Sequence, residues 1–127
     1  MRVTVNGARL FFDVEGLRLV PDGPVMKERP TVVLLHGGPG TDHTIYIPDM
    51  STLADRAQLI YFDLRGNGRS DPADPQHWTV SQWADDVAGL LDVLEIEQPY
   101  ILGASVGGFV AQTFAVTYPT RLSNNAT

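Results

Sequence analysis

The sequence predicts an α/β fold, in which an antiparallel N-terminal hairpin leads into a mostly parallel sheet with flanking helices. Three short apolar runs, at residues 31–35, 59–62 and 100–102, lack the alternation of a strand with one solvent-exposed face. We therefore expect both faces of these strands to be covered. Segments of helical periodicity separate the three runs. Strands that alternate with helices favour parallel pairing through right-handed crossovers.

The first 16 residues predict a β-hairpin. Polar and apolar residues alternate through this segment, with the apolar ones at Val3, Val5, Leu10, Phe12 and Val14. Asn6-Gly7 stands at the centre of the pattern, and this dipeptide favours the two-residue turn that joins antiparallel strands. Proline and glycine recur in residues 21–30, which predicts a turn-rich connection to the strand at 31–35.

The most regular helical pattern runs from Thr79 to Leu94. Apolar residues recur there on one face at three- and four-residue steps, at Val80, Trp83, Val87, Leu90, Leu91 and Leu94. Thr79 and Gln82 match a capping box, in which each side chain bonds the backbone N–H of the other residue. This match predicts that the helix begins directly after Thr79.

Two further segments predict helices. Residues 106–118 are apolar nearly all round, which is typical of a buried helix, and this helix is expected to stop before Pro119. Residues 46–57 are a weaker candidate, because Pro48 has to sit near the start of any helix formed there.

The composition indicates one acidic domain. The chain has 127 residues, the size of an ordinary domain, and we expect residues 1–127 to form a single unit. A formal net charge of −6 argues against a surface for nucleic acid or for an anionic membrane. The absence of cysteine excludes disulfides and cysteine nucleophiles. With no apolar run typical of a secretion signal or of a membrane span, a cytoplasmic location is expected.

Ser105 stands between a predicted strand and a predicted helix, in the sequence Gly103-Ala104-Ser105-Val106-Gly107. This is the G-x-S-x-G pattern, in which glycines flank a serine because the neighbouring backbones approach closely at a tight turn. We expect the Ser105 hydroxyl to be exposed at the helix N-terminus, where the partial positive charge stabilises a developing oxyanion. A glycine-rich turn with a helix-capping serine is the alternative interpretation.

A second glycine-rich loop, His36-Gly37-Gly38-Pro39-Gly40, directly follows the predicted strand at 31–35. Glycines in such a loop free backbone N–H groups to point into a cleft, which predicts one half of an oxyanion hole. The N–H of the residue after Ser105 is expected to be the other half. Taken alone, this loop is equally typical of a plain turn. Both loops follow strands, at the edge where open α/β sheets place their sites.

The loop at residues 63–71 carries two glycines spaced by one residue. A dinucleotide-binding loop is excluded, because Asp71 stands where the third glycine of that motif belongs. We interpret this loop as one braced by ion pairs and hydrogen bonds among Asp63, Arg65 and Arg69. A catalytic role for Asp63 is the less favoured alternative.

Together these motifs resemble the α/β-hydrolase superfamily. The loop His36-Gly37-Gly38-Pro39-Gly40, combined with the pattern Asp63-x-Arg65-Gly66-x-Gly68-Arg69-Ser70, is similar to the proline iminopeptidase-like branch. The resemblance covers the N-terminal half of such a domain, from the hairpin through the helix after Ser105. Val106 departs from the branch, whose better-known members carry a bulky aromatic residue after the serine. Related esterases and other hydrolases therefore stay open.

The resemblance implies a serine hydrolase that cleaves an amide or ester bond through an acyl-enzyme on Ser105. It also implies that Gly38 and Val106 supply the N–H groups of the oxyanion hole. The expected supporting residues of the two loops are His36, Gly37, Gly103 and Gly107. A small molecule or a short peptide is the expected substrate.

No base for Ser105 is evident in these 127 residues. In this superfamily the order along the chain is serine, acid, histidine. All three histidines (His36, His43 and His77) precede Ser105, and no Asp, Glu or His follows it. We expect His36 to brace its loop and His77 to be exposed. The chain resembles the N-terminal half of a hydrolase and is expected to be inactive alone; the alternative is a non-catalytic fragment or an interaction module.

The strand at 100–104 is expected to have one free edge. Unpaired N–H and C=O groups beside apolar surface favour association, so we expect a homo-oligomer or binding of a complementary C-terminal half at this edge. Neither a nucleic acid nor a membrane is an expected partner. No cofactor and no metal is implied, because the histidines are scattered and no His/carboxylate set has ligand spacing.

Overall fold

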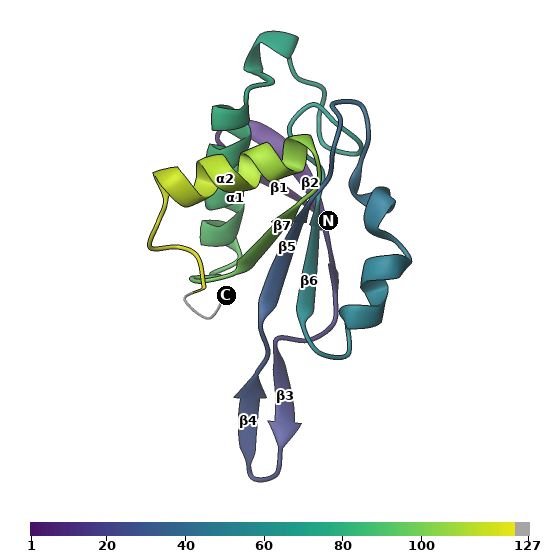
Figure 1. Ribbon diagram of the computed structural model, residues 1–127, viewed down its shortest axis with the longest axis vertical. Coiled ribbons are helices and arrows are strands. Elements are labelled where there is room, and N and C mark those ends of the chain that lie inside the picture. The colour runs from purple at the N-terminus through teal and green to yellow at the C-terminus, as the bar shows by residue number, and fades with distance from the viewer. Residues whose placement is uncertain (124–127) are drawn as a thin grey trace.

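The structure, a computed structural model, describes residues 1–123, so residues 124–127 of the predicted domain lie outside it. In chain order the elements are β1 (Arg2–Val5), β2 (Ala8–Glu15), β3 (Leu19–Asp22), β4 (Val25–Glu28), β5 (Thr31–Leu35), the 3₁₀ helices η1 (His43–Tyr46) and η2 (Asp49–Leu53), β6 (Gln58–Phe62), the 3₁₀ helix η3 (Pro75–His77), α1 (Val80–Val93), β7 (Tyr100–Gly103) and α2 (Val106–Thr117). Figure 1 shows α1 and α2 on one face of the sheet and η1 and η2 on the other.

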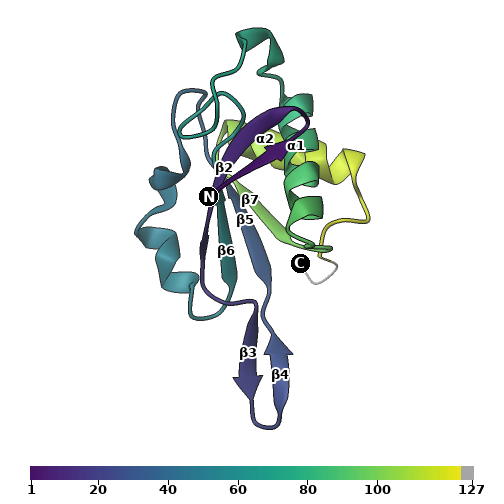
Figure 2. The ribbon, with the colours of Figure 1, turned by 180° about the vertical axis from the view of Figure 1, so that it is seen from behind.

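A five-stranded sheet of order β1-β2-β6-β5-β7 forms the centre of the fold. Strands β6, β5 and β7 are parallel, whereas β1 and β2 pair antiparallel with each other and β2 pairs antiparallel with β6. The predicted hairpin is confirmed, because Val5 pairs with Ala8 across the two residues Asn6-Gly7 (Figure 2). The predicted combination of a hairpin with a parallel set of strands is confirmed as well.

Strands β5 and β6 are buried on both faces, as their continuous apolar runs predict. The same expectation is wrong for β7, whose residues are only partly buried and whose Leu102 is 40% exposed, because β7 lies at the edge of the described sheet. On β5, Val33 and Leu35 point into the core beneath α1 and α2, while Leu34 packs with Tyr46 and Tyr61 on the opposite face. Each of these five side chains is less than a tenth exposed. Neighbouring residues of β5 therefore pack into two separate apolar layers, one on each face of the sheet. This explains why polar and apolar residues do not alternate in this part of the sequence.

The connection at residues 21–30 is more regular than the sequence predicts. Strands β3 and β4 pair antiparallel from Leu19 opposite Glu28 to Asp22 opposite Val25. This second hairpin projects away from the main sheet, at the bottom of Figure 1. Its residues are mostly exposed, so no hydrophobic pattern marks its strands in the sequence.

The helix expected at residues 46–57 is wrong. Two short 3₁₀ helices, η1 and η2, occupy this region, and Pro48 lies between them. Proline has no N–H for the helical ladder, and its ring restricts the preceding residue to extended backbone. Ile47 has such a backbone, with φ of −101° and ψ of 133°, so one continuous helix cannot form.

Helix α1 begins where predicted, but only half of the expected capping box forms. The Thr79 hydroxyl accepts a hydrogen bond from the Gln82 N–H at 3.1 Å. The Gln82 side chain does not return this bond; its amide donates to the Asp86 carboxylate at 3.0 Å. Asp86 is fully buried, and a buried carboxylate requires hydrogen-bond donors. The Gln82 amide therefore donates to Asp86, and it is not available to complete the capping box.

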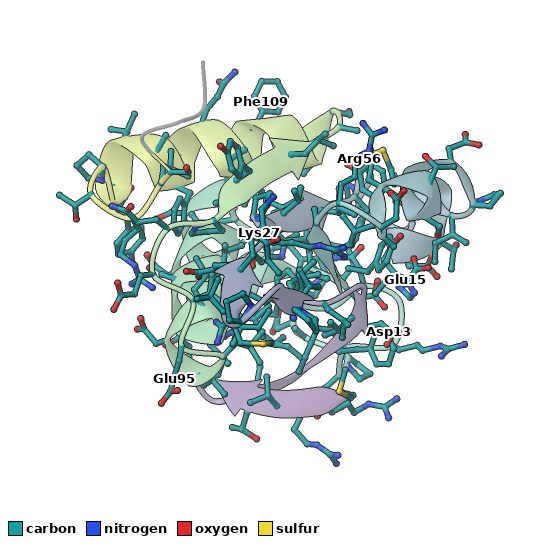
Figure 3. The ribbon with its side chains drawn as sticks, turned by 90° about the horizontal axis from the view of Figure 1, so that it is seen from below. Asp13, Glu15, Lys27, Arg56, Glu95 and Phe109 are labelled. Carbon is teal, nitrogen blue, oxygen red and sulfur yellow. The ribbon has the colours of Figure 1, made fainter. Side chains whose placement is uncertain are left out.

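Helix α2 is less buried than its sequence predicts. Val110 and Phe114 are fully buried against the core, as expected for an apolar helix. However, Phe109 is 59% exposed and Val116 is 82% exposed. Figure 3 shows Phe109 pointing outward from the body of the molecule. In the described part of the chain, one apolar face of α2 therefore has no cover.

Within residues 1–123, the helices are all too short or too polar to cross a lipid bilayer.

Candidate active site

Three loops meet at one edge of the sheet, because β5, β6 and β7 run parallel and end on the same side (Figure 1). They are residues 36–42 after β5, residues 63–71 after β6 and Ala104-Ser105 after β7. Ligand sites of open α/β sheets lie at this edge. The structure thus brings together the three segments that the sequence singles out.

Ser105 forms the tight turn between β7 and α2. Its φ is 54° and its ψ is −117°, a combination that L-residues rarely adopt and that costs of order 1–3 kcal/mol. The residue is exposed, and within the described chain its side chain makes no capping hydrogen bond to α2. The alternative interpretation of Ser105 as a helix-capping residue is therefore wrong, and its hydroxyl stands free at the head of α2.

Glycines make this turn possible by allowing backbone contact. A Cβ atom on Gly107 would lie 2.1 Å from the Leu35 carbonyl oxygen, and one on Gly103 would lie 2.1 Å from the Gly107 carbonyl oxygen. Both distances are far shorter than any real contact, and both are to backbone. The first turn of α2 is thereby packed directly onto the end of β5.

The first residue of α2 has a backbone N–H with no partner among the described residues. Gly107 N–H donates to the Ala104 carbonyl at 2.9 Å, and the N–H groups of Gly108 and Phe109 both donate to the Ser105 carbonyl, at 2.9 and 3.2 Å. Val106 precedes these residues, and its N–H is free among the described hydrogen bonds, as expected for the first residue of a helix. A free donor therefore directly follows Ser105.

His36 braces its own loop, as the sequence predicts. The ring is fully buried, and its Nε2 accepts a hydrogen bond from the Leu64 N–H at 3.0 Å. Because Nε2 accepts, the proton resides on Nδ1, which donates to the Gly37 carbonyl at 2.6 Å. Burial lowers the pKa of His36, which keeps the ring neutral and this tautomer fixed.

The Gly37–Gly38 peptide lies against the serine turn. A Cβ atom on Gly37 would lie 3.2 Å from the Ala104 carbonyl oxygen and 3.4 Å from the Ser105 Cβ, so the two loops touch at this point. The Gly38 N–H donates to no group in the described chain. The two predicted oxyanion-hole residues thus each present a free N–H near Ser105, Gly38 on the loop after β5 and Val106 at the start of α2.

Two side chains fix the loops relative to each other. The Tyr46 hydroxyl donates to the Leu35 carbonyl at 2.6 Å, at the point where β5 meets α2. Burial raises the pKa of Tyr46, so this donor keeps its proton. The Asn67 side chain accepts from the Gly40 N–H at 2.7 Å and donates to the Arg65 carbonyl at 3.0 Å, which joins the loops after β5 and β6.

The predicted cluster of Asp63, Arg65 and Arg69 exists as a bracing element, but its pairing is wrong. Asp63 accepts from the Nδ1 of His43 at 2.8 Å and from the backbone N–H of Arg69 at 2.9 Å. Arg65 instead forms two 2.8 Å hydrogen bonds with the buried Asp86 of α1. The hydrogen bond to Asp86 raises the pKa of Arg65. These partners lie 20 and 21 residues apart, beyond what local spacing reveals.

His43 has a buried bracing role that its position in the sequence does not indicate. The structure buries its ring beside Asp63 and brings donor atoms of Asp42, His43 and Asp63 within 4.8 Å of one another, although the sequence shows the histidines scattered. These atoms already have partners. Both the N–H and the Nδ1 of His43 bond one Asp63 oxygen, and Asp42 accepts two hydrogen bonds from Thr44. Asp42, His43 and Asp63 therefore use these atoms in hydrogen bonds within the protein.

In the described part of the chain, the hydrogen bonds of His36 and His43 go to groups other than Ser105. His36 has both ring nitrogens in hydrogen bonds, as described above. His43 is held by Asp63, and its ring packs on Phe11 and Tyr61. His77 lies exposed on η3, as the sequence predicts.

The chain matches the family described as alpha/beta hydrolase fold over residues 30–126. It belongs to this family. The chain is 34% identical over 125 residues to "Proline iminopeptidase PfmaB" of Pestalotiopsis fici, a match that covers 96% of this chain and 41% of the relative. It is 33% identical over 109 residues to "Putative carbamate hydrolase RutD" of a Caulobacter species, covering 86% and 40%. The crystal structure of the enol-lactonase from Burkholderia xenovorans superposes with a TM-score of 0.82 at 30% identity, covering 97% and 44%.

These comparisons confirm the resemblance to α/β-hydrolases, with an N-terminal region similar to proline iminopeptidases. The relatives are an iminopeptidase, a carbamate hydrolase and a lactonase by name, so the family is one of hydrolases whose named substrates differ. The chain spans 41% of the length of the iminopeptidase that it matches.

Alanine substitutions at two adjacent glycines test the close packing of α2. We expect Gly107→Ala to lower the free energy of unfolding by at least about 2 kcal/mol, because the new methyl group overlaps backbone. The control is Gly108→Ala, whose Cβ would lie 3.4 Å from its nearest neighbour, at ordinary contact distance. This variant gains about 0.5–1 kcal/mol from higher helix propensity. Urea denaturation measures both, and equal effects of the two substitutions would contradict the packing described here.

Proposed function

We propose that this chain carries the nucleophile and the oxyanion hole of a serine hydrolase similar to proline iminopeptidases. The observation that carries the proposal is the turn at Ser105. An exposed hydroxyl stands there in a strained backbone conformation, next to a free N–H at the head of α2 and another on the adjoining loop after β5. A capping or purely structural serine does not need this strain.

In the proposed reaction, the Ser105 Oγ bonds to the carbonyl carbon of an amide or ester as its proton passes to a base. The electron pair of the C=O bond moves to oxygen and forms an oxyanion. Its collapse restores the carbonyl and expels the amine or alcohol, which takes up the proton. Water then hydrolyses the acyl-enzyme by the same steps and frees Ser105.

The oxyanion binds between the N–H groups of Gly38 and Val106. Both groups belong to the backbone, so their direction is set by loop conformation rather than by a side-chain rotamer. The N-terminal end of α2 adds its partial positive charge at the same position. Each donor of such a hole lowers the barrier by about 3–4 kcal/mol.

The proposed substrate class is a small molecule or a short peptide with a free N-terminal proline. The support is the 34% identity to an iminopeptidase across 96% of this chain. Val106, an aliphatic residue after the serine, leaves ester or carbamate bonds as further candidates, and the names of the other relatives fit them.

The base comes from a polypeptide segment that adds to the free edge of β7. Ala104 N–H bonds the Leu35 carbonyl of β5, so the alternate residues Ile101 and Gly103 turn their N–H and C=O groups to the opposite side. β7 is the last strand of the described sheet on that side. Since Ser105 stands two residues after the end of β7, a parallel strand laid beside β7 ends near the serine.

A second candidate function is a non-catalytic interaction module. The observation in its favour is the uncovered apolar face of α2, where Phe109 is 59% and Val116 is 82% exposed. Without a base, a serine hydroxyl is a weak nucleophile near neutral pH. The two candidates differ in whether Ser105 reacts once a base is supplied.

Supplied imidazole tests the proposed nucleophile. We expect a fluorophosphonate probe to label Ser105, and the labelling rate to rise by about tenfold or more with added imidazole, which acts as a general base. Ser105→Ala removes the labelling, whereas Ser81→Ala, a change at an exposed serine of α1, leaves it unchanged. Mass spectrometry of tryptic peptides identifies the labelled residue. A chain that stays unlabelled at every imidazole concentration would favour the interaction module.

Light scattering tests the free edge of β7. With no complementary segment present, we expect the chain to associate with itself and to exceed its monomer mass of 13.9 kDa. A charge on the edge strand opposes this pairing, so Leu102→Lys returns the chain toward monomer. Leu53→Lys is the matched control, because Leu53 is 38% exposed and Leu102 is 40% exposed. A monodisperse wild-type monomer would overturn the expectation.

A further inference from the structure

The loop after β5 contains a second clamp on the peptide that carries the Gly38 N–H. The Thr41 hydroxyl donates to the Gly37 carbonyl at 2.5 Å and lies 3.3 Å from the His36 Nδ1. The Gly37 carbonyl therefore accepts two hydrogen bonds, one from each of these side chains. Thr41 belongs to no motif that the sequence analysis uses.

The geometry of a trans peptide turns this clamp into a means of directing the next N–H. The C=O and N–H of one peptide group point in opposite directions within a rigid plane. When two donors hold the Gly37 carbonyl, the Gly38 N–H is held pointing the other way. This peptide lies at the serine turn, with the Gly37 Cα packed beside Ser105.

The position of Thr41 relative to Gly38 adds a second restraint. Gly38 has a φ of +104°, which only glycine adopts without strain, so this backbone is free to reorient unless its surroundings hold it. A Cβ atom built on Gly38 would lie 3.0 Å from the Thr41 Oγ1, so the Thr41 side chain fills the space beside the Gly38 Cα. The Thr41 hydroxyl thus bonds the Gly37 carbonyl at one end of the peptide and lies beside the Gly38 Cα at the other.

We propose that Thr41 is a positioning residue for the oxyanion hole: by holding the Gly37 carbonyl together with His36, it fixes the Gly38 N–H toward the oxyanion. The inference rests on the proposed function, since it assigns Gly38 as an oxyanion donor. Thr41 touches no reacting atom and acts only through the peptide. A preorganised donor stabilises charge without reorganisation when the charge forms.

The test compares Thr41→Val, which keeps the branched shape but loses the hydroxyl, with Thr41→Ser, which keeps the hydroxyl. Phenylboronic acid is the probe, because its tetrahedral adduct with a serine hydroxyl carries an oxygen at the oxyanion position. We expect Thr41→Val to weaken phenylboronic acid binding by about tenfold and Thr41→Ser to stay within about twofold of wild type. Boron NMR measures the affinity, and the ¹⁵N shift of the Gly38 amide in the unliganded chain reports the peptide itself.

Thr44→Val is the matched control, because the Thr44 hydroxyl bonds Asp42 and not the Gly37 carbonyl. We expect this variant to leave the affinity and the Gly38 shift unchanged. Thr41→Ala repeats the loss of the hydroxyl with a smaller side chain, should the valine variant not fold. If loss of the hydroxyl moves neither the affinity nor the Gly38 resonance, the role of Thr41 is overturned. If wild type binds no phenylboronic acid even with imidazole added as the base, the proposed function fails, while the Gly38 shift still decides whether Thr41 holds the peptide.

Discussion

The direct backbone contact between the end of β5 and the first turn of α2 is the constraint on which the candidate site depends. At this point the Leu35 carbonyl oxygen occupies the space that a Gly107 side chain would need. The same oxygen accepts hydrogen bonds from the Ala104 N–H and the Tyr46 hydroxyl. One carbonyl group therefore joins β5, β7, η1 and α2. This close packing of α2 on β5 places the strained turn of Ser105 between them.

The chemically important groups of the proposed site are mostly backbone N–H groups, and side chains serve to hold them. His36, Thr41 and Asn67 each bond a backbone group of the loop after β5. Beneath them, Asp63 and His43 form a buried pair that ties this loop to the one after β6. Such a division of roles explains why so many polar side chains are buried near an exposed serine, since each replaces lost hydration with a hydrogen bond.

The elements with strong local signals were predictable from the sequence. Continuous apolar runs indicate the buried strands β5 and β6, and the Asn6-Gly7 turn indicates the first hairpin. The hairpin β3–β4 was not predictable, because its exposed strands need no apolar pattern. In the same way, the position of Ser105 follows from its flanking glycines, since only they permit the close backbone approach.

The partners of the buried charges could not be predicted. Asp63 and Arg65 are two residues apart in the chain, yet each bonds a residue from another element, His43 and Asp86 respectively. Only the packing of α1 and η1 against the loops brings these partners together. The glycine-rich loops indicate Gly38 and Val106 in the sequence, but whether their N–H groups are free depends on every acceptor that the fold brings near them.

A crystal structure of the chain with phenylboronic acid tests the central claim most directly. That claim is that Ser105 and the N–H groups of Gly38 and Val106 form one preassembled site. We expect boron bonded to the Ser105 Oγ, with one boronate oxygen about 2.7–3.1 Å from both nitrogens. A boronate oxygen that points into solvent, or an adduct that forms only after the loop after β5 has rearranged, would contradict the account.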